Sequence, residues 1–454
     1  MDRLGGARNR VATALAFALA ALCFLLPFVT AGCDERATAQ GIDFVTGDRP
    51  PTYDEDGNVV EPSGDDEDIA EILIREGAPT ATLALAFVLG AALLSLLPGV
   101  TTAGACLLSG AFALGAFSLF LLGLELRTEG AFGDLRVGFW LAVLLTAAGT
   151  ALARRQWAAV TAPLPEPRLG ARLLAGGALL SILAVIVPHV AVGTGDGEDT
   201  TPLAYVFLWA LSPGIRGTAA WTAIALVCLA FLVALSALVL SRAPTSASPA
   251  AAGAALGLAG LLFAVGSIAY MAALDGTGVG DGLWIQLAGA VLALAGGLVA
   301  VRGSGEERTT VPMPARVLAA LGALVVVAGT VVPYDRGMDD VPSRALLGLD
   351  TDLDRWFAFA PFGLAIAALV AALLLSRPQA CGALLGLGAG LGIMFLPLLY
   401  QAFSGQEDTP AGTLGAGGFV GLAGAALVVL AGVLARPPRT ESEQPPTGAR
   451  ASMQ

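Results

Sequence analysis

The sequence has no lysine and only one histidine, and each shortage excludes a class of site. All 24 basic residues of the 454-residue chain are arginine, so the lysine that a phosphate-binding P-loop needs is missing. The single imidazole, His189, cannot form an HExxH motif or a histidine-rich metal site. Four of the five cysteines lie in apolar runs, and no CxxC is present. We therefore expect no disulfide, no metal site, no cofactor and no catalytic set.

Charged residues are also scarce. They make up 13% of the chain, against about 25% in soluble domains, whereas apolar residues make up 56% and the mean hydropathy is +0.77. Several apolar runs exceed the roughly 20 residues that cross a bilayer as a helix. This composition predicts an all-α integral membrane protein surrounded by lipid, with no nucleic-acid partner. The twelve predicted spans are 11–33, 80–98, 103–124, 137–153, 173–193, 218–241, 251–274, 282–301, 317–334, 356–376, 379–403 and 411–435.

The charges between these spans indicate the orientation. With a cytoplasmic N-terminus, the inner segments hold 15 Arg and 6 acids, and the outer segments hold 9 Arg and 30 acids. This asymmetry follows the positive-inside rule and places both termini in the cytoplasm. Trp140, Trp284 and Trp356 then fall at outer span ends, where indole rings prefer the interface. A composition rich in Ala, Gly and Arg indicates a bacterial source, so we expect the bacterial cytoplasmic (inner) membrane.

The chain also repeats itself. The first, fifth and ninth spans each begin near an arginine and end at a proline 16 or 17 residues later. The arginines are Arg10, Arg172 and Arg316, and the prolines are Pro27, Pro188 and Pro333. We predict three parallel four-helix repeats at 1–155, 156–302 and 303–436, with a disordered cytoplasmic tail at 437–454. A ring and a row of repeats both remain open, as does the oligomeric state.

Small residues spaced four apart predict where helices pack closely. Such faces are formed by Gly382, Gly386 and Gly390, by Gly289, Ala293 and Gly297, and by Gly417 and Gly421. The strings that start at Gly253 and Gly382 match each other. These faces predict that the third and fourth helices of each repeat lie in the interior. A high glycine content alone is the alternative explanation.

The longest segment outside the spans, 34–79, is strongly acidic. The string TYDEDGNVV predicts a β-hairpin around Asp56, Gly57 and Asn58. The acids do not have the spacing of an EF-hand calcium loop, so a solvated acidic surface is the simpler interpretation. Short apolar stretches near Ile72, Tyr205 and Leu346 predict interfacial helices on the outer leaflet.

Polar groups inside the spans are few, and none of the spans contains Asp, Glu or Arg. Buried ionisable groups usually mark ion or proton paths, so this absence disfavours a proton-coupled transporter. A polar pocket lined by Gln286, Tyr270 and Tyr400 is one hypothesis, with Gln401 nearby. Glu125 is expected at the interface. His189 is expected to be a polar anchor at the outer interface, and a dyad with Ser109 is the weaker alternative.

The string Thr30-Ala31-Gly32-Cys33 follows an arginine-flanked apolar run and resembles the processing site of bacterial lipoproteins. The resemblance implies a lipidated Cys33 at a new N-terminus. Against it stands the match between the first span and the fifth and ninth, which are not cleaved.

These observations favour a non-catalytic inner-membrane protein whose acidic outer face binds a protein partner or shields the bundle. A transporter or flippase for a neutral or lipidic substrate is the second hypothesis. An enzyme is disfavoured because no acid and base are placed together.

Overall fold

The computed structural model describes most of the membrane-spanning part of the chain. The described residues are 2–31, 36–46, 48, 50–53, 59–60, 69–97, 100–127, 135–160, 168–193, 200–204, 213–243, 246–273, 277–304, 309–332, 355–403 and 416–437.

Each of the twelve predicted ranges holds a helix. The helices are α1 (Asp2–Leu22), α3 (Ile69–Leu96), α4 (Val100–Arg127), α5 (Val137–Val160), α6 (Leu169–Ile186), α8 (Pro213–Arg242), α9 (Ala247–Ala273), α10 (Asp281–Arg302), α11 (Met313–Val331), α12 (Arg355–Leu374), α13 (Arg377–Phe403) and α14 (Gly417–Leu434). Ten contain an apolar stretch long enough to cross a membrane, and α3 and α12 contain shorter ones at Thr80–Leu96 and Phe359–Leu374. The prediction of a helical multi-pass membrane protein is confirmed.

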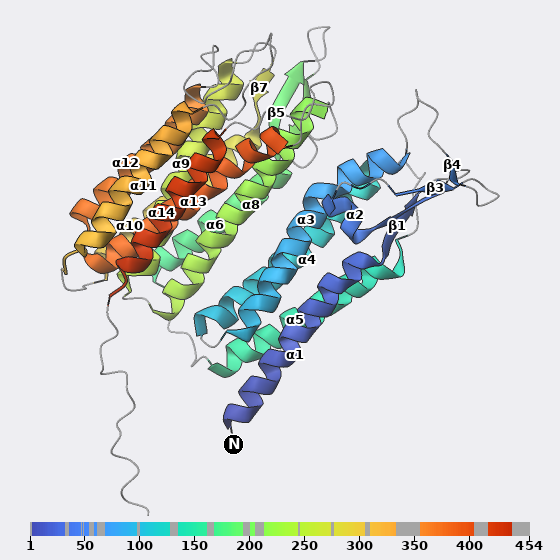
Figure 1. Ribbon diagram of the computed structural model, residues 1–454, viewed down its shortest axis with the longest axis horizontal. Coiled ribbons are helices and arrows are strands. Elements are labelled where there is room, and N and C mark those ends of the chain that lie inside the picture. The colour runs from blue at the N-terminus through green and yellow to red at the C-terminus, as the bar shows by residue number, and fades with distance from the viewer. Residues whose placement is uncertain are drawn as a thin grey trace, which may run out of the picture.

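The helices pack as three four-helix bundles. The first bundle contains α1, α3, α4 and α5, the second α6, α8, α9 and α10, and the third α11, α12, α13 and α14. In every bundle the first helix packs on the second and fourth, and the third also packs on the second and fourth. The second bundle lies between the other two (Figure 1). It contacts the first through α8 with α3 and α4, and the third through α9 and α8 with α13 and α9 with α12.

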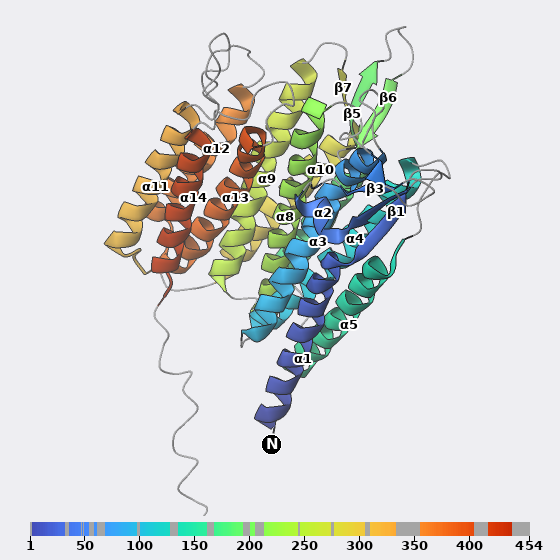
Figure 2. The same ribbon diagram turned by 45° about the vertical axis from the view of Figure 1, so that its right-hand side comes forward.

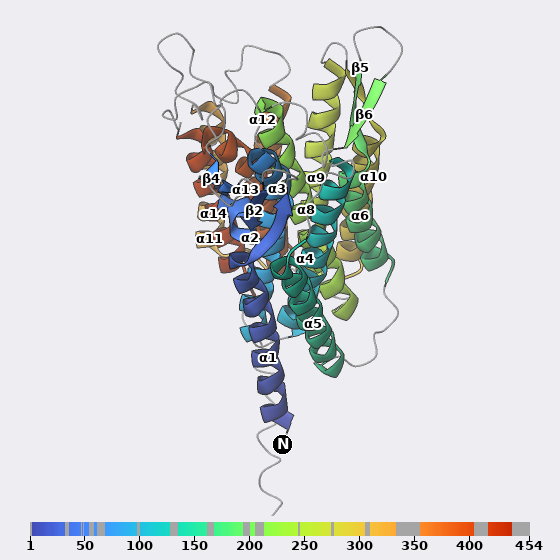
Figure 3. The ribbon, with the colours of Figure 1, turned by 90° about the vertical axis from the view of Figure 1, so that its right-hand side faces the viewer.

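The contacts between helices therefore arrange the three bundles as a row. The second bundle contacts the third more extensively than it contacts the first. Figure 2 shows α3 beside α8, and Figure 3 shows α1 and α5 on the face of the molecule away from α11 and α14.

In each bundle one proline follows the first helix and ends it, for a local steric reason. The ring of a proline disfavours the helical conformation of the residue before it. Leu26, Val187 and Val332, which precede these prolines, have ψ values of 159°, 143° and 132°. The predicted spans 11–33 and 173–193 were therefore too long. Strands β1 (Pro27–Ala31) and β5 (Pro188–Gly193) follow at once, the former after a 3-10 turn η1 (Cys23–Leu25).

Two small antiparallel sheets lie on the first and second bundles, at the helix ends opposite the N-terminus (Figure 1). The first has the order β1, β2 (Arg36–Gln40), β3 (Thr52–Tyr53) and β4 (Val59–Val60), and the second has β6 (Thr200–Ala204), β5 and β7 (Thr277–Val279). Thr52 pairs with Val60 and Tyr53 with Val59. The predicted turn between them falls outside the described residues, so the hairpin stays a prediction. A short helix α2 (Gly41–Thr46) follows β2 and packs on α3.

One of the predicted interfacial helices is wrong. Ile72 belongs to α3, which runs without a break from Ile69 to Leu96 into the second predicted span. Gly77 and Pro79 lie between the two stretches, and the helix accommodates both. The stretches at Tyr205 and Leu346 lie outside the described residues.

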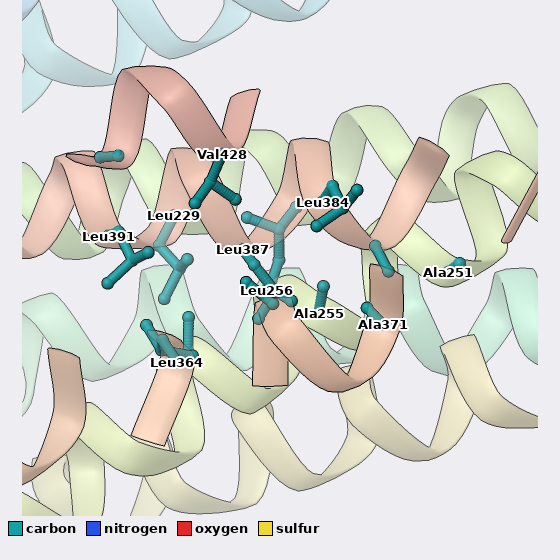
Figure 4. Close-up of a cluster of buried hydrophobic side chains, with 14 of the residues drawn as sticks. Leu229, Ala251, Ala255, Leu256, Leu364, Ala371, Leu384, Leu387, Leu391 and Val428 are labelled. Carbon is teal, nitrogen blue, oxygen red and sulfur yellow. The ribbon is translucent and has the colours of Figure 1, made fainter. Parts of the chain in front are cut away.

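The bundles have different cores. The first is rich in phenylalanine, with Phe17, Phe24, Phe28 and Phe139 almost completely buried. The second and third share one core of mainly alanine and leucine. Figure 4 shows part of this shared core, where Leu229, Leu256, Leu364 and Leu387 come together from four helices.

Candidate functional site

The most unusual polar group in the described spans is Gln286. It lies on the buried face of α10 and is 2% exposed. Neither its Oε1 nor its Nε2 atom has a hydrogen-bond partner. An unsatisfied amide in an apolar environment costs about 2 to 7 kcal/mol, and lipid supplies no water to relieve it. Such a group requires an explanation beyond packing.

Ser267 on α9 shares this property. It is 2% exposed and its hydroxyl has no partner. The hydroxyls of Ser181, Ser236 and Thr330 instead bond a carbonyl three or four residues earlier in their own helix. This local bond is the usual way for a serine or threonine to be satisfied inside a helix. Ser267 therefore differs from these three hydroxyls, and the buried hydroxyl of Thr146 on α5 likewise has no partner.

The register of the helices places Gln286 and Ser267 in the half of the second bundle that lies toward the β-sheets. A Cβ atom on Gly260 of α9 would lie 3.3 Å from Ala290 of α10, and one on Gly257 would lie 2.8 Å from Ala293. The two helices are thus antiparallel, and continuing this register brings Ser267 within about one turn of Gln286. Both residues lie near the end of the bundle at which β7 contacts α9 and β5 contacts α10.

The buried face of α10 continues the polar character on both sides of Gln286. One turn outward, a Cβ atom on Gly282 would lie 2.8 Å from Nδ1 of His189. About one turn inward, a Cβ atom on Gly289 would lie 3.0 Å from Oγ of Ser181. We call Gln286, Ser267, Ser181 and His189 the polar column of the second bundle.

The prediction that His189 is a polar anchor at the interface is wrong, because the side chain is buried in the protein. Its side chain is 0% exposed, because the strand after Pro188 turns it onto Gly282 at the start of α10. The amide of Gly280 also donates to the His189 carbonyl at 2.8 Å. Burial lowers the pKa of His189 to about 3, and a backbone hydrogen bond at Val187 opposes this shift in part. The imidazole is therefore neutral at physiological pH. Ser109 belongs to α4 of the first bundle, so the dyad has no support from the packing.

The predicted small-residue faces lie at helix contacts. On α13, a Cβ atom on Gly386 would lie 2.7 Å from the Ala252 carbonyl, and one on Gly390 would lie 2.8 Å from Ala259. Gly382 touches the Ser248 backbone in the same way. Numbers rise together on the two helices, so α9 and α13 run parallel. We call this contact the glycine seam, and it leaves no room for a side chain at these three positions of α13.

The other small-residue faces join helices within one bundle. Gly289 faces Gly177 on α6, and Gly297 faces Ala254 on α9. Gly417 faces Val332 at the end of α11, whereas Gly421 faces Phe395 on α13.

Several predicted site residues cannot be placed. The side chains of Tyr270, Tyr400, Gln401 and Glu125 lie outside the described part of the structure, as does Cys33. The polar pocket and the lipidation therefore stay predictions. Processing at Cys33 would remove α1, whose Phe17 is fully buried. Within the described residues, no three His, Cys, Asp or Glu side chains are grouped so as to hold a metal ion.

Two contacts were not predicted from the sequence. Arg136, just before α5, donates through Nε to Oγ1 of Thr30 at 2.8 Å, and Thr30 lies 3.1 Å from the hydroxyl of Thr38. Arg242 stacks on Trp157 at 4.4 Å from the ring centre and thereby joins the second bundle to the first. Single polar residues far apart in sequence give no local pattern that would reveal such pairs.

Comparison with known proteins assigns no family: no family model, no curated protein and no solved structure matches this chain.

Proposed function

We propose that this chain is a non-catalytic protein of the bacterial cytoplasmic membrane, built from three four-helix repeats, whose acidic outer face binds a protein partner. The repeat rests on an equivalent contact in each bundle. A Cβ atom on Gly138, Gly282 or Gly417, at the start of the fourth helix, would meet the carbonyl of Pro27, Val187 or Val332 respectively. These carbonyls lie at or just before the proline that ends the first helix.

The orientation rests on the distribution of arginine. The described arginines at the helix ends on the N-terminal side are Arg8, Arg10, Arg154, Arg155, Arg168, Arg172, Arg242, Arg302, Arg316, Arg377 and Arg436. The positive-inside rule assigns this side to the cytoplasm. The sheets, and the segments that carry 30 of the 36 acids, then face outward.

The observation that carries the partner-binding proposal is the contrast between closed helix contacts and a highly charged outer face. The glycine seam leaves no space for a pathway along this contact of α9 with α13. The outer segments carry 30 acids against 9 arginines. A field of one sign on a single face attracts a partner of opposite charge and raises its association rate. The partner expected is therefore a protein with a basic surface.

The test is capture of the partner from solubilised native membranes. Deletion of 50–68, which removes a large share of the outer acids, should abolish capture. Deletion of 437–454 is the matched control because it removes a segment of similar length from the opposite side. Capture that survives the first deletion contradicts the proposal, and so does capture that is lost only with the tail.

Transport or flipping of a neutral or lipidic substrate is the second candidate, and the unpartnered amide of Gln286 is the observation that favours it. A substrate that needs no counter-charge would suit spans without ionisable side chains. Flux of a neutral solute into proteoliposomes that is lost in Gln286→Met would favour this alternative. Equal flux in empty vesicles would remove it.

A further inference from the structure

The position that Gln286 occupies in the second bundle is filled differently in the third bundle. The shared contact of Gly282 and Gly417 with the carbonyl before the proline makes Gln286 equivalent to Gly421 of the third bundle. There, the ring of Phe395 from α13 covers Gly421. Gly257 of α9 contacts α10 as Gly388 of α13 contacts α14, so these two glycines occupy equivalent positions. By the same count along the helices, Ala264 of α9 is equivalent to Phe395 of α13. An apolar ring thus fills the third bundle at the level where the second bundle has an amide.

The second bundle therefore has a polar interior that its packing does not require. The amide of Gln286 offers two donors and an acceptor, and the Ser267 hydroxyl offers both functions. Neither group is satisfied by the protein. Buried polar groups that lack a protein partner are commonly satisfied by a bound molecule or an internal water.

The position along the membrane is shallow. Trp284, two residues before Gln286, is 53% exposed on the opposite face of α10, at the level where indole rings meet the headgroups. Gln286 thus lies about one and a half turns inside the outer end of α10, which begins at Asp281. A molecule from the outer side reaches this depth without crossing the apolar centre of the bilayer.

We propose that the second bundle holds a binding site, between α6, α9 and α10, for a small neutral molecule with both donor and acceptor groups, which bonds to Gln286 and Ser267. Ser181 and His189 line its two ends. A charged occupant does not fit, because the described wall residues are neutral and the His189 imidazole does not supply a charge. The occupant is either water or a neutral solute, and both share this hydrogen-bonding chemistry.

Access is tested with the small neutral thiol reagent methyl methanethiosulfonate and site-resolved peptide mass spectrometry. Only a thiolate reacts, and it forms only where water reaches the sulfur. Ser267→Cys should react about tenfold faster than Ser236→Cys. Ser236 is the matched control, because it is a buried serine that bonds its own helix. Adding Gln286→Met, which keeps the shape and removes the amide, should return Ser267→Cys to the control rate.

The intact mass of the chain with native Ser267, released from lipid discs, shows whether the occupant is water or a neutral solute. A bound neutral mass that disappears in Gln286→Met identifies a solute, and in that case slow labelling of Ser267→Cys reflects its shielding. Fast labelling without a bound mass identifies water. Labelling as slow as in Ser236→Cys without a bound mass overturns the proposal. Fast labelling that Gln286→Met leaves unchanged also overturns it.

Discussion

The first bundle and the contact between the second and third bundles use different means to hold helices together in lipid. In the first bundle, phenylalanine rings from η1, α4 and α5 contact one another, as Phe24 does with Phe117 and Phe117 with Phe139. At the glycine seam, by contrast, the backbones of α9 and α13 touch directly. Lipid chains are as apolar as the side chains, so helix association depends on close packing rather than on exclusion of water.

The comparison teaches that the two regions should respond to opposite kinds of substitution. Rings fill the first bundle, and removing one leaves a cavity. Gly110 and Gly149 make room there for Phe17, since a Cβ atom on either would lie 3.0 Å from its ring. The seam has no such space, so adding a single methyl group there forces two backbones apart.

The largest effect is expected at the seam. Gly382→Ala places a methyl group against the Ser248 backbone, which cannot rotate away. We expect a loss of about 3 kcal/mol in unfolding free energy, the upper end of overpacking effects. The measurement is reversible unfolding in mixed detergent micelles. Gly392→Ala is the control on the same helix, because nothing lies within 4 Å of its new Cβ atom.

Gly392→Ala should be neutral or stabilising, since alanine favours the helix by about 1 kcal/mol. An equal loss in both variants would show that the seam is not a special contact.

A smaller effect is expected for Phe17→Ala in the first bundle. The side chain is fully buried, and its removal leaves a cavity worth about 2 kcal/mol, because the transfer term is largely absent in lipid. Leu19→Ala is the control, because Leu19 is 48% exposed on the same helix. Unfolding followed by the absorbance of the aromatic side chains should show a lower unfolding free energy in Phe17→Ala alone. Equal stability of the two variants would contradict the description of an aromatic core.

The third prediction compares His189 with Phe28, the residue after the equivalent proline in the first bundle. The folded imidazole has a pKa of about 3, against 6.5 in an exposed chain. Below pH 6.5 the unfolded chain binds a proton that the folded chain does not. The free energy of unfolding therefore decreases as the pH is lowered. The slope is about 1.4 kcal/mol per pH unit, which amounts to about 2 kcal/mol at pH 5.

His189→Phe should remove this part of the pH dependence. The comparison of the two chains between pH 7 and pH 5 isolates the imidazole, because the two chains are otherwise identical in sequence. Parallel stability curves would contradict the buried neutral imidazole.

The smallest effect concerns the contact between the first and second bundles. The Arg242 and Trp157 pair should contribute about 1 kcal/mol. A double-mutant cycle with Trp157→Leu and Arg242→Gln measures the coupling energy directly. A coupling near zero would leave this contact to apolar packing, which includes the rings of Phe87, Phe112 and Phe231.

Local signals in the sequence predicted the helices well and the strands poorly. The string from Pro188 to Gly193 is apolar except for His189, and a helix and a strand explain it equally well. Its strand state depends on pairing with Thr200–Ala204 and Thr277–Val279, which are distant in sequence. Pro188 was recognised as a helix end, but its effect on Val187 sets the boundary several residues earlier than predicted.

The packing faces were predictable, but their partners were not. The spacing of Gly382, Gly386 and Gly390 indicated a close contact without showing that α9 is the helix that fills it. The sequence similarity pairs Gly253 with Gly382. The packing instead pairs Gly257 with Gly388, which is a shift of two residues. Gln286 was predicted to line a polar pocket, but no local pattern indicated that its amide has no hydrogen-bond partner.

The central proposal, an acidic outer face that binds a protein, is tested most directly by native mass spectrometry of the chain released from its own membrane in lipid discs. We predict a stoichiometric second polypeptide with a basic surface, present on the wild-type chain and on the chain lacking 437–454, and absent when 50–68 are deleted. A wild-type chain that carries no second polypeptide, or one that keeps it after 50–68 are deleted, would contradict the proposal.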